Sequence, residues 1–206
     1  MANPELAVII ARWSRVDPKG KVTETERSFP VQFNPKEFSL EKGVQLGEIA
    51  IPGLDAPLQQ FVRGQAEKLS VELFFDTTED GTGVDATSVT SLTDQIYQLA
   101  KVESSSHAPP IVTFCWNRHF PGDSLSLGGG QLRNSFVGVV ESVRQQFTLF
   151  SSEGVPLRAT VNLVLREYRT LDQQLDELKL SSPDKSHAHT LAERDTLSGL
   201  AHSYYR

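Results

Sequence analysis

The 206-residue sequence contains a single cysteine, Cys115, and this scarcity excludes two kinds of architecture. One thiol cannot build an internal disulfide framework, and it cannot supply the thiolates of a structural zinc site. No apolar run approaches the roughly 20 residues that a membrane-spanning helix needs. The opening residues lack the basic and long apolar regions of a secretory signal, so we expect none. These absences favour a soluble, intracellularly made protein without redox chemistry and without a membrane partner.

Positive charge is also in short supply. Lysine and arginine number 20 against 26 aspartates and glutamates, which gives a net charge of -6. An acidic chain is poorly suited to a phosphate backbone, so we expect no nucleic-acid partner. Hydrophobic residues make up 38% and charged residues 22%, which is the composition of a folded protein. The length allows one domain with an appendage.

What the sequence has in abundance is alternation of apolar and polar residues, the pattern of half-buried strands. In Leu69–Phe75 the residues Leu69, Val71, Leu73 and Phe75 share one face, and Phe74 on the other face suggests that it too is partly covered. Residues 43–66 contain Pro52-Gly53 and Pro57 and are expected to form a long irregular surface loop. The predicted strands cover residues 8–13, 21–26, 29–33, 38–41, 69–75, 111–116, 136–143, 146–150 and 157–168.

One segment has helical spacing. Between residues 88 and 103 the apolar positions recur every three or four residues, which predicts one amphipathic helix with Ser88 as its N-cap. The predicted apolar stripe consists of Val89, Leu92, Ile96, Leu99 and Val102. Many short strands with one covering helix favour a mainly β (α+β) fold, an antiparallel β-barrel or sandwich that is closed or nearly closed.

The composition changes after the last strand. We expect a barrel domain over residues 1–170, a short helix and linker over 171–188, and a separate segment over 189–206. Leu171, Leu175 and Leu178 have the spacing of that short helix.

Candidate catalytic or metal-binding groups are weak. Asp76, Thr78, Asp80 and Gly81 occupy places of a calcium loop, but the twelfth place is Thr87 rather than glutamate, which favours a solvated turn. Cys115 with His107 and His119 suggests a nucleophile, but its strand context favours a buried core thiol. Four charges on or near strands are expected to be ordinary surface groups, which could pair across strands or with a neighbouring subunit: Glu141, Arg144, Arg166 and Glu167. We expect no catalytic, metal or cofactor site. The barrel itself could hold a small ligand, or it could present its strand edges to further copies.

Six segments in a fixed order carry a resemblance. They are FNPKEF (33–38), LSVELFFDT (69–77), PPIVTFCW (109–116), FVGVVESV (136–143), FTLF (147–150) and GVPLRA (154–159). Together they resemble the tube-like adaptor proteins of contractile injection systems, the phage-tail-like particles. The motif residues that this resemblance assigns to structural roles are Phe33, Asn34, Pro35, Phe75, Asp76, Thr77, Trp116, Gly138, Pro156 and Arg158.

The last segment resembles the opening of a LysM module. Its candidate partner-contact residues are Asp195, Thr196, Leu197, Leu200 and Tyr204. The second helix and closing strand of such a module are missing from the 206 residues, so we expect an incomplete module.

The resemblance implies a structural role without catalysis or cofactors. It implies a hexameric ring in the baseplate that joins the inner tube or its initiator proteins to the trimeric spike, with the LysM region contacting wedge proteins. It also implies assembly in the bacterial cytoplasm, within a particle that is released or retained there. A peptidoglycan-binding LysM protein and a small-ligand β-barrel stay open as alternatives.

Overall fold

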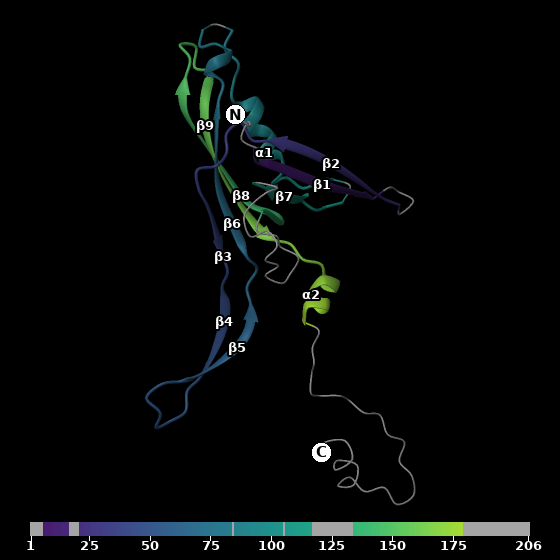
Figure 1. Cartoon of the computed structure of the whole chain (residues 1–206), viewed down its shortest axis with the longest axis vertical. Helices are drawn as coiled ribbons and strands as arrows, with labels where there is room; N and C mark the ends of the chain where they lie inside the picture. Colours follow the sequence, from purple (N-terminus) through teal and green to yellow (C-terminus); the bar gives the residue numbers. More distant parts are fainter. Residues whose placement is uncertain (1–5, 17–20, 84, 105, 117–133, 179–206) are drawn as a thin grey trace, which may run out of the picture.

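A computed structural model describes residues 6–16, 21–83, 85–104, 106–116 and 134–178. Most strands belong to one antiparallel seven-stranded sheet with the order β2-β1-β7-β8-β9-β6-β3 (Figure 1). The strands of this sheet are β1 (Val8–Val16), β2 (Val22–Pro30), β3 (Phe38–Glu41), β6 (Lys68–Asp76), β7 (Ile111–Cys115), β8 (Ser135–Phe150) and β9 (Pro156–Glu167). The mainly β, antiparallel fold that the alternation predicts is confirmed.

Four further elements complete the described chain. β4 (Val44–Ile49) and β5 (Leu58–Gly64) form a separate two-stranded hairpin. A short 3-10 turn, η1 (Thr78–Asp80), follows β6, and the helices are α1 (Thr90–Gln98) and α2 (Leu171–Leu178). Neither described helix has the length and apolar character that crossing a bilayer requires.

The core lies on one face of the curled sheet. In β9 the residues Ala159, Val161, Leu163 and Leu165 are completely buried, and β6 contributes Leu69, Val71, Leu73 and Phe75 to the same cluster. α1 adds Val89, Ile96 and Leu99 to this cluster. Burial of these apolar side chains is the main favourable contribution to folding, because it removes their surface from water.

The two edges of the sheet are joined by side chains rather than by strand pairing. Among the described residues β2 and β3 stay unpaired with each other, so the barrel is nearly closed rather than closed by a continuous ladder. The segment between them crosses the gap. On one side Val31 continues the β1–β2 ladder, its N–H donating to the Ala7 carbonyl at 3.1 Å. On the other side the Gln32 amide exchanges two hydrogen bonds with the backbone of Asp76 at the end of β6, at 2.6 and 2.8 Å.

The prediction of an irregular loop over residues 43–66 is wrong. This stretch is the β4–β5 hairpin, which extends away from the sheet beyond β3 and β6 (Figure 1). Pro52-Gly53 and Pro57 lie only in its tip, outside both strands, so they break the chain at the turn and not along its length. A register shift between Gln45 and Leu46 marks a bulge near its base.

Two pairs of predicted strands are each one strand. The segments 21–26 and 29–33 belong to β2 as far as Pro30, because Arg27 and Ser28 keep pairing with β1. The segments 136–143 and 146–150 form the single strand β8, because Arg144 and Gln145 keep pairing with β9. Arg27, Ser28 and Arg144 are exposed within a continuous ladder, whereas the half-buried Gln145 donates its Nε2–H to the Thr93 carbonyl of α1 at 2.9 Å.

The helix α1 is shorter than predicted. It ends at Gln98 rather than at residue 103, since Ala100 and Lys101 donate to carbonyls three residues earlier and tighten the last turn. Val102 consequently lies outside the helix and is exposed. At the other end Val89 is the N-cap, and Ser88 Oγ accepts from the Thr90 N–H at 3.3 Å. The rest of the predicted stripe does face the core.

Candidate assembly site

The motif residue Asp76 organises one end of the sheet. Its carboxylate accepts two hydrogen bonds from Arg158, at 2.7 Å from Nη2 and 2.8 Å from Nε, and one from the Thr78 N–H at 2.9 Å. Hydrogen bonds from Thr78, and then the hydrogen bond and charge of Arg158, lower the pKa of Asp76 against an opposing effect of burial. Both carboxylate oxygens of Asp76, the first position of the predicted calcium loop, are therefore already bound by groups of the protein itself.

An aromatic and cationic row continues from this ion pair across the outer face. The Arg158 guanidinium lies 5.7 Å from the ring centroid of Phe74, and the Phe33 ring lies 5.6 Å from Phe74 on its other side. Phe74 is 38% exposed, so the prediction that this face of β6 is partly covered is confirmed. The row connects β9, β6 and the linker that crosses the gap.

Thr77 and Pro156 fix the start of α1 over the same end. Thr77 is buried, its N–H donates to the Leu157 carbonyl at 2.9 Å, and its Oγ1 lies 2.7 Å from the Thr87 carbonyl oxygen. The Pro156 carbonyl accepts the Val89 N–H at 2.9 Å. These bonds satisfy buried backbone groups at the helix start.

The remaining motif residues also connect elements. Trp116 stacks on Phe38 of the edge strand β3 with 4.4 Å between ring centroids, and the Asn34 carboxamide oxygen accepts the Ala7 N–H at 2.7 Å. Gly138 lies where β8 passes close to β9. A Cβ at this glycine would overlap the Arg166 carbonyl group, 2.9 Å from its carbon. Pro35 is half-buried in the linker and Phe75 belongs to the core. The motif residues therefore hold the sheet ends and edges together, and they do not gather into one pocket.

Sequence reasoning missed the role of Glu167, which it treated as a surface charge. The Glu167 side chain is only 4% exposed and accepts hydrogen bonds from Lys42 Nζ at 2.9 Å, from the Glu67 N–H at 2.8 Å and from Arg169. Burial would raise the pKa of Glu167, but the Glu67 N–H, Lys42 and Arg169 outweigh it and lower the pKa. This cluster joins the sheet, the hairpin base and the start of α2. Glu141, by contrast, pairs with Lys68 and Arg166 at the surface, as predicted.

The residues considered as a possible nucleophile or metal site do not come together in the described structure. Cys115 is half-buried rather than part of the core, because it points to the opposite side of β7 from the buried Phe114. His107 is exposed in a turn with φ of 52°, and His119 lies outside the described residues. Within the described chain no three His, Cys, Asp or Glu side chains gather as a metal ion would require.

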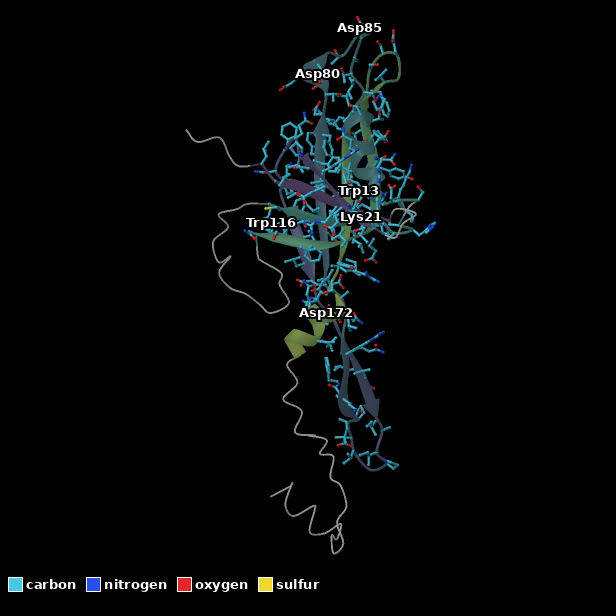
Figure 2. All side chains as sticks on the ribbon, turned by 90° about the vertical axis from the view of Figure 1, so that its right-hand side faces the viewer. Trp13, Lys21, Asp80, Asp85, Trp116 and Asp172 are labelled. Carbon is cyan, nitrogen blue, oxygen red and sulfur yellow. The ribbon has the colours of Figure 1, made fainter. Side chains whose placement is uncertain are left out.

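The most unusual surface is the hairpin. Leu46 opposes Phe61 on one face and Ile49 opposes Leu58 on the other, and all four side chains are about half exposed or more. Figure 2 shows the side chains of this ribbon extending from both sides, away from the rest of the sheet. An isolated two-stranded hairpin is at best marginally stable in water, and large exposed apolar patches mark interaction sites. The exposed apolar residues of the hairpin and its tip are Val44, Leu46, Ile49, Ile51, Leu54, Leu58, Phe61 and Val62.

Two free sheet edges accompany the hairpin. The outer edges of β2 and β3 are unpaired in the described chain. Free edges are templates for pairing with another chain. Together with an apolar ribbon that the described residues leave exposed, these edges are the kind of surface at which structural subunits associate.

Comparison with known proteins identifies the family. A family model described as "contractile injection system tube protein" matches residues 8–176, and the chain therefore belongs to this family. It is a structural component of a contractile injection system, and this family is not a family of enzymes. A search of curated proteins found no match. The LysM-like residues Asp195, Thr196, Leu197, Leu200 and Tyr204 lie outside the described residues.

Proposed function

We propose that the chain is an adaptor subunit that closes into a hexameric ring in the baseplate and joins the inner tube to the trimeric spike. The observation that carries the proposal is the combination of two unlike free edges with an apolar hairpin, in a member of the tube-protein family. The inner tube or its initiator proteins would contact one side of the ring and the spike the other.

The two edges favour a ring over a two-fold dimer. β2 is nine residues long and exposes charged residues such as Glu24 and Glu26, whereas β3 has four residues with the sequence Phe-Ser-Leu-Glu. Unlike surfaces that meet form a heterologous contact, and a heterologous contact gives a ring when its rotation closes. A two-fold dimer would instead pair one edge with itself.

The hairpin supports association through apolar burial. Because its two faces both carry exposed apolar residues, covering one face leaves the other in water. A ribbon of this kind is fully buried only when it inserts between neighbouring surfaces. The core among the described residues, in contrast, is filled by its own side chains, which does not favour the alternative of a small-ligand barrel.

The proposal also covers the residues after the barrel. We propose that the chain consists of a domain over 1–170, a helix and linker over 171–188 and a LysM-like segment over 189–206. The LysM-like segment would contact wedge proteins. A pulldown of the full chain on insoluble peptidoglycan tests the alternative, since retention would favour a glycan-binding role.

Light scattering and negative-stain microscopy of the full chain test the ring. We expect particles with six-fold symmetry, and Phe61→Glu should shift the chain toward monomers. Gln59→Glu is the matched control, because it adds the same charge on the same hairpin face without removing apolar area. A chain that stays monomeric at all concentrations, or forms only a two-fold dimer, would contradict the ring.

Particles assembled without this protein give a second test. If the chain joins tube to spike, such particles should show no tube growth in negative stain. Normal sheathed tubes would refute the adaptor role, even if the isolated chain forms rings.

A further inference from the structure

The helix α2 carries an apolar stripe that the described chain does not cover. Leu171 is 69% exposed and Leu175 is 56% exposed, and their spacing of four residues places both on one helix face. An isolated helix of two turns is unstable in water and depends on packing of its apolar face. The stripe therefore needs a covering surface.

Local contacts fix the start of α2 beside the end of β9. Thr170 and Gln173 form a reciprocal capping box, with the Thr170 N–H donating to Gln173 Oε1 at 3.0 Å and the Gln173 N–H to Thr170 Oγ1 at 3.3 Å. The preceding residue, Arg169, is tied to the buried Glu167. Gln174 adds a bond from Nε2 to the Arg169 carbonyl at 3.4 Å. Because these contacts hold the helix start beside the sheet while Leu171 and Leu175 stay exposed, a second chain can cover the stripe without moving the helix.

A groove large enough for the apolar half of a two-turn helix lies at the base of the hairpin, and Gln174 of the same chain's α2 is part of its wall. It has a volume of about 890 Å³, and its apolar lining includes Phe61 and Val62, which are 63% and 55% exposed. A two-turn helix is roughly 12 Å long and about 10 Å across, so its apolar half needs about 450 Å³. α2 and the hairpin lie at the same end of the sheet, and Figure 2 shows Asp172 near the hairpin base.

Helix and groove also carry opposite charge. The sequence of α2, LDQQLDEL, has three acidic residues and no basic one. The groove is lined by Lys42, Arg63, Arg169 and the single carboxylate of Glu167. Arg63 donates its Nε–H to the neutral Gln45 amide at 2.7 Å, and in the described part of the chain its charge has no carboxylate partner. An acidic helix would supply one.

We propose that α2 of one copy docks, with its leucine stripe inward, into the hairpin-base groove of a neighbouring copy. This contact rests on the proposed function, because it requires that copies assemble. Each copy carries both a helix and a groove, so the contact is heterologous and can repeat around a ring. It assigns α2 the role of a latch between subunits, separate from the pairing of strand edges.

Site-specific cross-linking tests the latch. In a Cys115→Ser background the chain has no cysteine, so Leu175→Cys and Val62→Cys can each be introduced alone at exposed positions. The two single-cysteine proteins are mixed under conditions of assembly and treated with bismaleimidoethane. We expect a covalent dimer from this mixture. Glu153→Cys, exposed in the β8–β9 turn, replaces Val62→Cys as the control and should give no dimer.

The outcomes separate the latch from the ring. Wild-type rings without the Leu175–Val62 dimer would overturn the latch and leave the proposed function intact. A chain carrying both cysteines that yields only an intramolecular product would also overturn it, because the helix would then cover its own groove. A wild-type chain that never assembles would overturn both proposals.

An association measurement gives an independent readout. Leu175→Glu should raise the concentration at which half of the chains are assembled by about tenfold or more, since burial of one leucine is worth about that factor. Asp172→Asn, which lies on α2 outside the stripe and keeps all apolar area, should have a smaller effect. Equal association of wild type and Leu175→Glu would contradict the latch.

Discussion

Replacing Glu167 with glutamine tests the buried cluster that joins the sheet, the hairpin and α2. The substitution keeps the shape of the side chain, and the glutamine oxygen can still accept the Glu67 N–H. Lys42 and Arg169, however, lose the carboxylate that both contact. Glu167→Gln therefore removes the charge and leaves most of the packing unchanged.

The expected loss of stability follows from the exposure of the two cations. Breaking a fully buried ion pair costs about 3–5 kcal/mol. The Lys42 side chain is 47% exposed and that of Arg169 is 21% exposed, so water can partly replace the lost contact. We therefore expect the free energy of unfolding to fall by about 2 kcal/mol at pH 7, within the usual range for hydrogen bonds to a charged group. For a domain of this size the melting temperature should fall by roughly 4–8 °C.

The pH dependence of this difference has a definite sign. The pKa of Glu167 is lowered in the folded chain from its ordinary value of 4.5. A carboxylate with a lowered pKa stabilises the fold above its unfolded pKa, and that stabilisation is lost as the pH falls through the folded pKa. The difference between wild type and Glu167→Gln should consequently be full at neutral pH and shrink progressively below about pH 4.5.

Urea unfolding of the dilute chain, followed by tryptophan fluorescence, measures the difference. Glu153→Gln in the exposed β8–β9 turn is the control and should change stability by less than about 0.5 kcal/mol. Equal stability of Glu167→Gln and wild type at pH 7 would refute the argument for a buried, paired carboxylate. A difference that stays constant down to pH 3.5 would refute its electrostatic origin.

Three further predictions concern the motif residues and use the same unfolding measurement. Gly138→Ala should destabilise the chain by about 2 kcal/mol or more, because its Cβ would overlap the Arg166 carbonyl group. The control Gly83→Ala, with no atom within 4 Å of the new Cβ, should be nearly neutral. Similar losses of stability for both variants would contradict the close approach of Gly138 to β9. Thr77→Val should cost about 1–2 kcal/mol, since it removes a buried hydroxyl that bonds the Thr87 carbonyl, and an unchanged midpoint would count against this bond. A double-mutant cycle of Asp76→Asn and Arg158→Met should give a coupling of about 1 kcal/mol, because the Arg158 side chain is 41% exposed, and a coupling of zero would show that the ion pair adds nothing.

The strands of the core could be predicted because one of their faces is buried in the core and the other is more exposed. In β6 and β9 every second residue is buried and its neighbours are more exposed, so alternation alone gives the correct faces. The hairpin over 44–64 could not be predicted in this way. Its two faces are equally apolar and equally exposed, so the residues show no alternation that a core would impose, and the proline and glycine of the tip dominate the pattern.

For the site residues, too, local sequence signals could be recognised, whereas contacts between residues far apart in the sequence could not. The motif strings predict structural roles for Asp76 and Arg158, but their ion pair joins residues 82 positions apart and becomes visible only in the fold. Glu167 looks like a surface charge in the sequence because Lys42, 125 positions away, and the Glu67 N–H, 100 positions away, reach it only in the fold. One local signal was available for α2: Thr170 and Gln173 have the spacing of a capping box.

The gap between β2 and β3 has a consequence for how this subunit can evolve. In a barrel closed by a continuous ladder, a change in circumference requires a change in strand number or register. Here the edges are connected by the Gln32 amide, by Asn34 and by the stacked rings of Phe38 and Trp116. Substitutions at Gln32, Asn34 or Trp116, which lie outside the strands, can therefore alter the separation of the edges without altering any strand. Related subunits could differ in this separation by a few such changes while keeping the same core.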